Sequence, residues 1–354
     1  MKKQFVWGAI ALLVLAAMAC SLGGKTATPP PQATSAPAGG ATSAPPSGGE
    51  ATSVAPATEE APPLEIAPNA LENLNSYRSR LIWTQTVEGK PTETLTMEQE
   101  ETRQPPARRI VLTSEGGENP GTMELVQIGN TSWMCSPDGG CIQTQQSGEE
   151  STPTFGEGMI WKPEDFASSD YQYVGRDTVN GVRSRHYTMN LTPEMLAGMV
   201  QGTVTATKAD VWVADEAGVP AYVTRFTISY EGTQEDGKKI QGDWTYGVYD
   251  VNQPITIQPP EGATGVPEDI PVYPGATDQA IMGALIMFSS ADAVEDVAEF
   301  YRTQMPAQGW TAGEESTLGN MVTQEWTKGD RKASLMISPK DEGGCSVMIS
   351  IEQP

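Results

Sequence analysis

The sequence predicts a mainly β protein with an α+β tail. We expect a curved antiparallel sheet that forms an unclosed half-barrel with short helices, and then a small C-terminal antiparallel sheet with one helix. Three observations predict this fold class. Residues 64–260 contain many short runs in which apolar and polar residues alternate. Turn residues such as Asn180-Gly181 separate these runs at hairpin spacing. Residues 291–304 carry apolar residues at helical spacing, and three strand-like runs follow them.

The first 20 residues have the pattern of an export signal. Lys2 and Lys3 precede an uncharged apolar run of about 15 residues, whereas a spanning helix needs about 20. The run ends in small residues directly before Cys20, which resembles the lipobox of bacterial lipoproteins. That resemblance implies cleavage before Cys20 and acyl chains on its sulfur and its new amino terminus. We therefore expect an extracytoplasmic protein anchored to a membrane by lipid; a plain secreted protein is the alternative.

Composition divides the rest of the chain into three parts. Residues 21–63 are almost wholly Ala, Thr, Ser, Pro and Gly, so they cannot form a core and should be a disordered tether. Residues 64–260 read as one β-rich domain. Pro259-Pro260-Glu261-Gly262 marks the joint to a second, α+β domain at residues 261–354.

The β-rich domain should open with a short helix at residues 68–75 and carry a second short helix at residues 193–200. The runs between and around them have strand character. They are residues 77–87, 92–101, 109–113, 123–128, 131–134, 142–145, 171–178, 182–191, 204–214, 221–230 and 240–251.

Three of these runs present bulky apolar residues on one face. An antiparallel sheet must cover such a face, and the helices available are short. We therefore expect room for an apolar ligand, such as a lipid or an acyl chain; a filled core fits the same residues. The candidates for the lining of a ligand cavity are Leu81, Trp83, Phe226, Ile228, Trp244, Tyr246 and Val248.

Three segments of this domain resemble the LolA/LppX-like bacterial lipoproteins. They are residues 71–78 (LENLNSYR), residues 211–223 (VWVAD followed by GVPAYV) and residues 249–255 (YDVNQPI). The resemblance covers about residues 66–260. It implies an unclosed β-barrel with a helical lid, whose cavity binds acyl chains of lipids or of lipoproteins. No single binding residue is implied, because the family lines its cavity by general apolarity.

The second domain should consist of one strand at residues 280–288, a helix at residues 291–304 with Ser290 as its N-cap, and three further strands. Those strands are expected at residues 321–327, 332–338 and 345–352. The segment Tyr273-Pro274-Gly275-Ala276, with Gly309-Trp310 after the helix, resembles a tail module of bacterial lipoproteins. That resemblance implies no activity.

The four cysteines fall into three roles. Cys20 is taken by the anchor. Cys135 and Cys141 flank a turn-forming stretch, Ser-Pro-Asp-Gly-Gly, and an exported protein meets oxidants, so we expect a hairpin disulfide. Two free thiols, or a metal pair without further ligands, are the alternatives. Cys345 lies in a strand-like run and should be a buried thiol.

Charge and composition exclude several classes of function. The formal net charge is −23, which repels phosphate backbones and makes nucleic acid an unsuitable partner. His186 is the only histidine, and we expect it to be exposed on its strand. The sequence therefore predicts no metal site, no cofactor and no enzyme. A protein that binds or carries an apolar ligand is the leading hypothesis, and a surface-displayed structural or interaction lipoprotein with a filled core is the second.

Overall fold

The computed structural model describes residues 62–117, 120–137, 140–145, 170–192, 196, 200, 202–263 and 265–352. The predicted signal segment with Cys20, nearly all of the 21–63 tether and most of the predicted helix at 193–200 lie outside these residues. Among the described residues, no helix combines the length and the apolar character that crossing a membrane requires.

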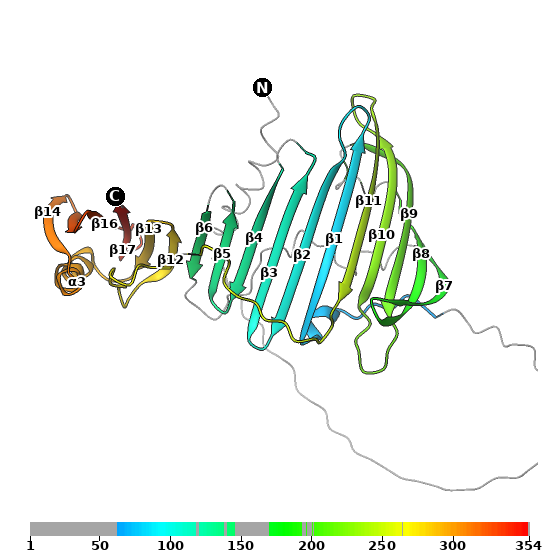
Figure 1. The fold of residues 1–354 in the computed structure, drawn as a ribbon, viewed down its shortest axis with the longest axis horizontal. Helices are drawn as coiled ribbons and strands as arrows, with labels where there is room; N and C mark the ends of the chain where they lie inside the picture. Colours follow the sequence, from blue (N-terminus) through cyan, green and yellow to red (C-terminus); the bar gives the residue numbers. More distant parts are fainter. Residues whose placement is uncertain are drawn as a thin grey trace, which may run out of the picture. The chain divides into compact units, whose positions relative to one another are not determined.

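In the described part of the chain, 17 strands form one antiparallel sheet, and residues 76–249 supply eleven of them, which we call the large sheet and which Figure 1 shows side by side. Each hydrogen-bonds its neighbour in the order β7–β8–β9–β10–β11–β1–β2–β3–β4–β5–β6. The strands are β1 (Ser76–Val87), β2 (Glu93–Arg103), β3 (Pro106–Glu115), β4 (Gly121–Ile128), β5 (Thr131–Ser136), β6 (Gly140–Gln145), β7 (Asp170–Val179), β8 (Val182–Asn190), β9 (Thr203–Ala214), β10 (Val223–Thr233) and β11 (Lys239–Tyr249).

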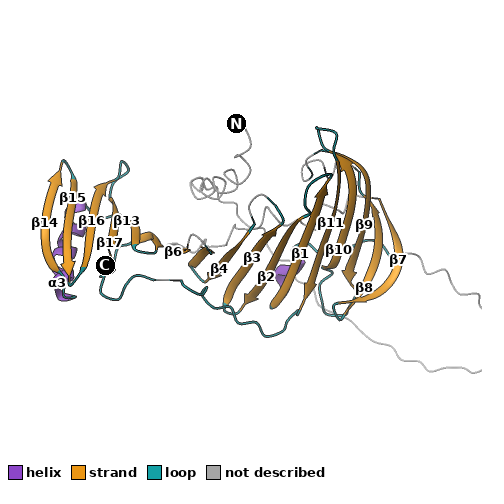
Figure 2. Cartoon of the chain, turned by 45° about the horizontal axis from the view of Figure 1, so that its top comes forward, coloured by secondary structure: helices purple, strands orange, loops and turns teal. Residues whose placement is uncertain are grey.

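The sheet curves and does not close, as the sequence predicts (Figure 2). Within the described ranges, β7 pairs only with β8. The hairpin between them turns at Asn180 and Gly181, whose φ values are 51° and 84°. Two positive φ values suit the Asn-Gly pair, because Gly has no Cβ and Asn tolerates this region. The pairing between β1 and β11, which are far apart in the sequence, places Trp83 opposite Trp244.

The chain before β1 packs against one face of this sheet. A 3₁₀-helix, η1 (Ala70–Asn73), buries Ala70 in a cluster with Leu74, Tyr222 and Val248. Further upstream, the Tyr187 hydroxyl donates hydrogen bonds to the carbonyl oxygens of Pro62 and Pro63, at 3.2 and 3.0 Å. The expected short helix at the start of the domain is therefore present, and it covers part of the sheet.

Within residues 265–352, the structure has six strands and one helix. Here β12 (Thr277–Met282) pairs with β6 and with β13 (Leu285–Ser290). The remaining elements are α3 (Val294–Ala307), β14 (Thr311–Leu318), β15 (Met321–Lys328), β16 (Arg331–Pro339) and β17 (Cys345–Glu352). The helix α3 packs on β14–β16 (Figure 2). It buries Val297, Ala298, Tyr301 and Met305 in a filled core.

Three predictions for this part are wrong in detail. The single strand at 280–288 is two strands, because the chain turns at Gly283, which has φ +56°. The helix begins at Val294 rather than Ala291; Ser290 ends β13, and its Oγ accepts a hydrogen bond from the Asp292 amide instead of capping α3. The strand β14 was not expected, because all eight of its residues are exposed and show no apolar alternation.

Candidate functional site

Strand pairing brings the predicted cavity residues together on one face. Leu81 lies opposite Tyr246, and Trp83 lies opposite Trp244. On the other side of β11, Phe226 pairs with Tyr246 and Ile228 pairs with Trp244. Val248 shares the face with Tyr246, because the two are separated by two positions on one strand.

Burial divides this predicted set into two groups. Phe226, Ile228 and Val248 are 6%, 1% and 0% exposed and belong to packed clusters. Phe226 and Ile228 share their cluster with fully buried side chains of β8 and β9, such as Tyr187 and Val211. The four remaining side chains, Leu81, Trp83, Trp244 and Tyr246, are half-buried. The face under β8–β11 is therefore largely a filled core, as a structural or interaction lipoprotein would have. Apolar side chains become partly exposed from β11 toward β1.

From β1 to β6 the same face carries a continuous set of large apolar side chains that we call the apolar face. Cross-strand partners form its rows: Leu81, Met97, Leu112 and Met123 make one row. Met97 and Ile110 are buried, and the other members are half-buried. The apolar face consists of Leu81, Trp83, Leu95, Met97, Ile110, Leu112, Met123, Leu125, Met134 and Ile142.

At one end of the apolar face lies a group of polar residues that we call the polar cluster: Tyr77, Gln99, Glu101, Arg103 and Arg108. Glu101 is only 3% exposed and stands at its centre. Arg108 binds both oxygens of the Glu101 carboxylate, through Nε at 2.9 Å and Nη2 at 3.2 Å. Arg103 Nη1 lies 2.7 Å from Glu101 Oε1. Two planar guanidinium groups around one carboxylate make a strong, geometrically defined contact.

Two neutral side chains complete the polar cluster. The Tyr77 hydroxyl donates to Glu101 Oε2 at 3.0 Å, and Gln99 Nε2 donates to the same oxygen at 2.9 Å. Burial, reinforced by the negative charge of Glu101, raises the pKa of Tyr77 well above its usual range. Tyr77 is therefore a neutral hydrogen-bond donor at physiological pH.

Only two members of the apolar face, Leu81 and Trp83, and no member of the polar cluster were predicted from the sequence. The strands β2–β6 have shorter and less aromatic apolar sets than β10 and β11. The register of the strand pairs would have revealed these residues. Leu81 pairs with Met97 and Met97 pairs with Leu112, which places the apolar side chains of neighbouring strands in one row.

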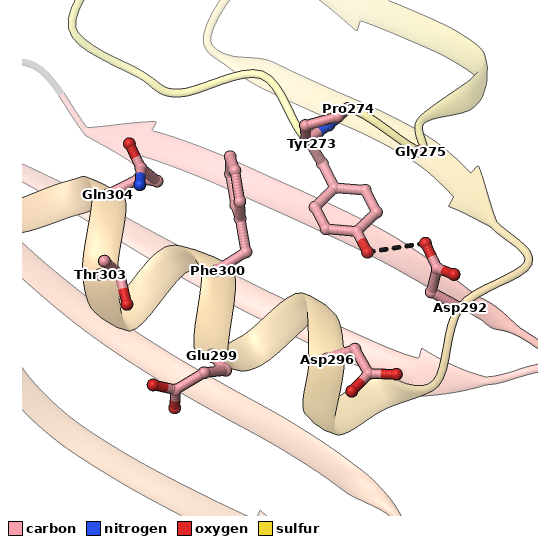
Figure 3. A pocket seen from close by; sticks show the side chains of 9 residues that line it. All are labelled: Tyr273, Pro274, Gly275, Asp292, Asp296, Glu299, Phe300, Thr303 and Gln304. Carbon is pink, nitrogen blue, oxygen red and sulfur yellow. Dashed lines mark hydrogen bonds between the residues drawn. The ribbon is translucent and has the colours of Figure 1, made fainter.

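The C-terminal part carries an open groove of about 470 Å³ beside α3 (Figure 3). Tyr273 and Phe300 line it, with their rings edge-to-face at 5.1 Å. The Tyr273 hydroxyl donates to Asp292 Oδ2 at 2.7 Å. Burial and this carboxylate raise the pKa of Tyr273 to about 12. Because Ser290 Oγ also bonds the Asp292 carboxylate, the carboxylate is engaged by the protein's own side chains.

The single histidine is less exposed than expected. The side chain of His186 is only 16% exposed, and its ring stacks on Trp212 with the ring centroids 4.2 Å apart. Its Nε2 lies 2.9 Å from Asp210 Oδ1, and Arg225 lies over the Trp212 ring. His186 is thus part of a packed group on the sheet surface, and the expectation of an exposed side chain is wrong.

The three described cysteines lie where the sequence places them. Cys135 and Cys141 are opposite each other on β5 and β6 and form the expected disulfide. Cys345 is a free thiol with no exposed area, in the core that α3 covers. Within the described ranges, no group of three or more His, Cys, Asp or Glu side chains is placed to hold a metal ion.

Comparison with known proteins gives one family match. A family model described as START domain-like matches residues 270–344, which is less than half of the chain. No curated protein matches the chain.

Several solved structures are similar to this chain at low sequence identity. The lipoprotein LppX of Mycobacterium tuberculosis is 16% identical, with 54% of this chain and 93% of that chain covered and a TM-score of 0.33. The MucA/MucB complex of Pseudomonas aeruginosa is 13% identical, with 80% and 91% covered and a TM-score of 0.23. A LolA superfamily protein from Nitrosomonas europaea is 9% identical, with 49% and 86% covered and a TM-score of 0.18. These TM-scores are low, so neither function nor ligand is taken from these proteins.

Proposed function

We propose that this protein is an extracytoplasmic lipoprotein, held at a membrane by a lipid on Cys20, that binds or carries a lipid acyl chain on its apolar face. One observation carries the ligand part of the proposal. The sheet buries its large apolar side chains almost completely under β8–β10, but leaves most of those of the apolar face partly exposed on six adjacent strands. Contiguous exposed apolar area of this kind marks a binding surface.

The composition of the apolar face suits a flexible hydrocarbon ligand. Met97, Met123 and Met134 lie on three of its strands. Methionine is unbranched and polarisable, so it adapts to ligands of variable shape. Removing apolar surface from water contributes roughly 25 cal/mol per Å², so a ligand that buries about 400 Å² gains about 10 kcal/mol before the cost of association. Binding would be passive and would need no catalytic residue.

The proposed anchor and tether would keep this face near its ligand. Residues 21–61 are rich in Pro, Ala, Ser and Thr, and Pro62 and Pro63 dock on Tyr187 where the described chain begins. A flexible chain of about 40 residues spans roughly 35–40 Å. The apolar face would then work within reach of membrane lipid.

A second function is favoured by the filled core under β8–β10. Tyr187, Val211 and Ile228 have at most 1% exposure, so this half of the sheet has no room for a ligand. A surface-displayed interaction lipoprotein would need nothing more than such a core.

Native mass spectrometry of the full chain purified from its own membranes separates the two functions. A lipid carrier should retain acyl lipids at a defined stoichiometry after detergent removal. Exclusively lipid-free protein, which also fails to take up added palmitate, would refute the carrier and leave the interaction lipoprotein. Metabolic labelling with palmitate, compared between the natural chain and Cys20→Ser, tests the anchor: the label must depend on Cys20.

A further inference from the structure

The groove beside α3 combines aromatic rings with acidic side chains. Figure 3 shows Tyr273 and Phe300 next to each other in it, with Asp292 and Asp296 toward one end and Gln304 at the other. Both rings are partly exposed. The volume of about 470 Å³ falls within the range of about 300–1,000 Å³ that ligand pockets occupy, so the groove has room for a ligand.

The spacing of the lining residues along α3 sets the length of the groove. Asp296, Phe300 and Gln304 follow one another at intervals of four residues and therefore lie on one face of the helix. The helix rises about 1.5 Å per residue, so this face is about 12 Å long from Asp296 to Gln304. An extended chain advances about 3.3 Å per residue, and about four of its residues would match this length.

The acidic side chains on this side of α3 exceed the positive charge that the described residues supply. Three glutamates share the single guanidinium group of Arg302, at distances between 2.7 and 2.9 Å. They are Glu295, Glu299 and Glu315. Glu299, which also lines the groove, is therefore only partly neutralised. Asp296 is exposed and forms no ion pair with any described residue.

The negative charge acts directly at the aromatic rings. Burial, the hydrogen bond to Asp292 and the charge of Asp296 raise the pKa of Tyr273 to about 12. Lys340 does not offset this charge by direct pairing: it donates to Ser289 Oγ at 3.4 Å and forms no ion pair with a carboxylate of the described residues. A ligand in the groove therefore meets aromatic surface beside unpaired negative charge.

This combination suits an organic cation. Aromatic rings attract a guanidinium or ammonium group that lies within about 6 Å of the ring centroid. Arginine also stacks on rings and binds a carboxylate through paired donors. In the described part of the chain, acidic side chains are not placed to hold a metal ion.

We propose that the groove binds an extended, arginine-bearing segment of a protein partner, with guanidinium groups on the Phe300 ring and at the Asp296 carboxylate. A basic segment is complementary to a chain whose formal net charge is −23. The groove is open along α3, so a peptide chain can lie in it and continue beyond both ends. This interaction is separate from the apolar face and does not depend on the proposed lipid binding.

The test compares two peptides that differ in charge alone. Isothermal titration calorimetry measures the affinity of the full chain for acetyl-Ala-Arg-Ala-Arg-Ala-amide and for the same peptide with citrulline in place of both arginines. Citrulline keeps the shape of arginine without its charge, so we expect it to weaken binding by about tenfold or more. N-acetyl-argininamide should also bind about tenfold more weakly, because it fills only part of the groove.

Three variants assign the binding to the groove. Phe300→Leu removes the ring without changing the net charge, and Asp296→Asn removes the unpaired carboxylate; each should weaken binding of the arginine peptide about fivefold. Asp341→Asn is the matched control, since Asp341 is an exposed residue between β16 and β17 that does not line the groove. Its affinity should stay within about twofold of that of the natural chain. Thermal unfolding of each variant confirms that it is folded before the affinities are compared.

Each contrary outcome would overturn the proposal. Equal affinity for the arginine and citrulline peptides, or no binding of either, would exclude recognition of a cation. Equal losses in Asp296→Asn and Asp341→Asn would make general charge the cause, and unchanged affinity in Phe300→Leu would exclude the ring. If N-acetyl-argininamide bound as tightly as the peptide, the groove would be a site for a small cation and not for a protein segment. None of these results bears on the proposed lipid binding, which is tested separately.

Discussion

Replacing Leu112 with Ser should weaken lipid binding in addition to weakening the fold. Leu112 and Val111 are neighbours on β3, both half-buried, and they point to opposite faces of the sheet. Only Leu112 belongs to the apolar face, where it pairs with Met97 and Met123. Val111→Ser is therefore a control that places the same polar group on the same strand.

The expected size follows from how much of Leu112 is still exposed. Complete burial of a Leu side chain is worth about 1.5–3 kcal/mol. Leu112 is only partly exposed, so folding already gains most of this, about 1–2 kcal/mol, and a covering acyl chain would gain the smaller remainder, about 0.5 kcal/mol. Leu112→Ser should thus lower the free energy of unfolding by about 1–2 kcal/mol and weaken lipid binding about twofold.

Urea unfolding measures the free energy of unfolding, and displacement of a fluorescent fatty acid measures the lipid affinity. Val111→Ser should show a comparable loss of stability with unchanged affinity. Unchanged lipid affinity in Leu112→Ser, or an equal loss in both variants, would refute the assignment of the apolar face as the ligand surface.

Three predictions concern stability. A hydrogen bond from Arg302 lowers the pKa of Glu315, so this pair stabilises the fold above the ordinary Glu pKa of about 4.3, and the contribution is lost as pH falls further. Glu315→Gln should therefore lower stability at pH 7 by less than about 1 kcal/mol in thermal unfolding, and the difference from the natural chain should shrink as pH falls below the ordinary Glu pKa. A loss that stays the same at acid pH would exclude the ion pair as the cause. Cys135→Ser should lower the free energy of unfolding by about 2 kcal/mol, as measured by urea unfolding. A reductant should then destabilise the natural chain but not this variant, and an equal effect on both would contradict the reasoning. Tyr301→Phe should not destabilise, because the Tyr301 hydroxyl is buried without a partner among the described residues; a loss above about 1 kcal/mol would contradict this.

Local patterns were sufficient to predict most strands of the large sheet. The Asn180-Gly181 turn and the alternation along β10 and β11 are signals that lie within a few residues of each other. Elements without such a signal were missed or merged. The strand β14 has only exposed residues, and the turn at Gly283 interrupts an otherwise apolar run.

The candidate site was harder to predict, because it depends on pairing between distant strands. Alternation shows that Ile228 and Trp83 each lie on an apolar face, but not that one is buried and the other half-buried. The polar cluster was missed for the same reason. Glu101 and Arg108 read as ordinary surface charges in the sequence, and only the β2–β3 register makes them partners on the sheet.

The division of the sheet into a filled half and a partly exposed half gives each a different role in the energetics. In the filled half, side chains such as Tyr187 and Val248 have no exposed area, so this half can stabilise the fold without a ligand. The apolar face contributes less to folding, and its remaining exposed area is available for binding. If the chain carries a ligand, as we propose, it can release that ligand without unfolding, which a carrier requires and a purely structural lipoprotein does not.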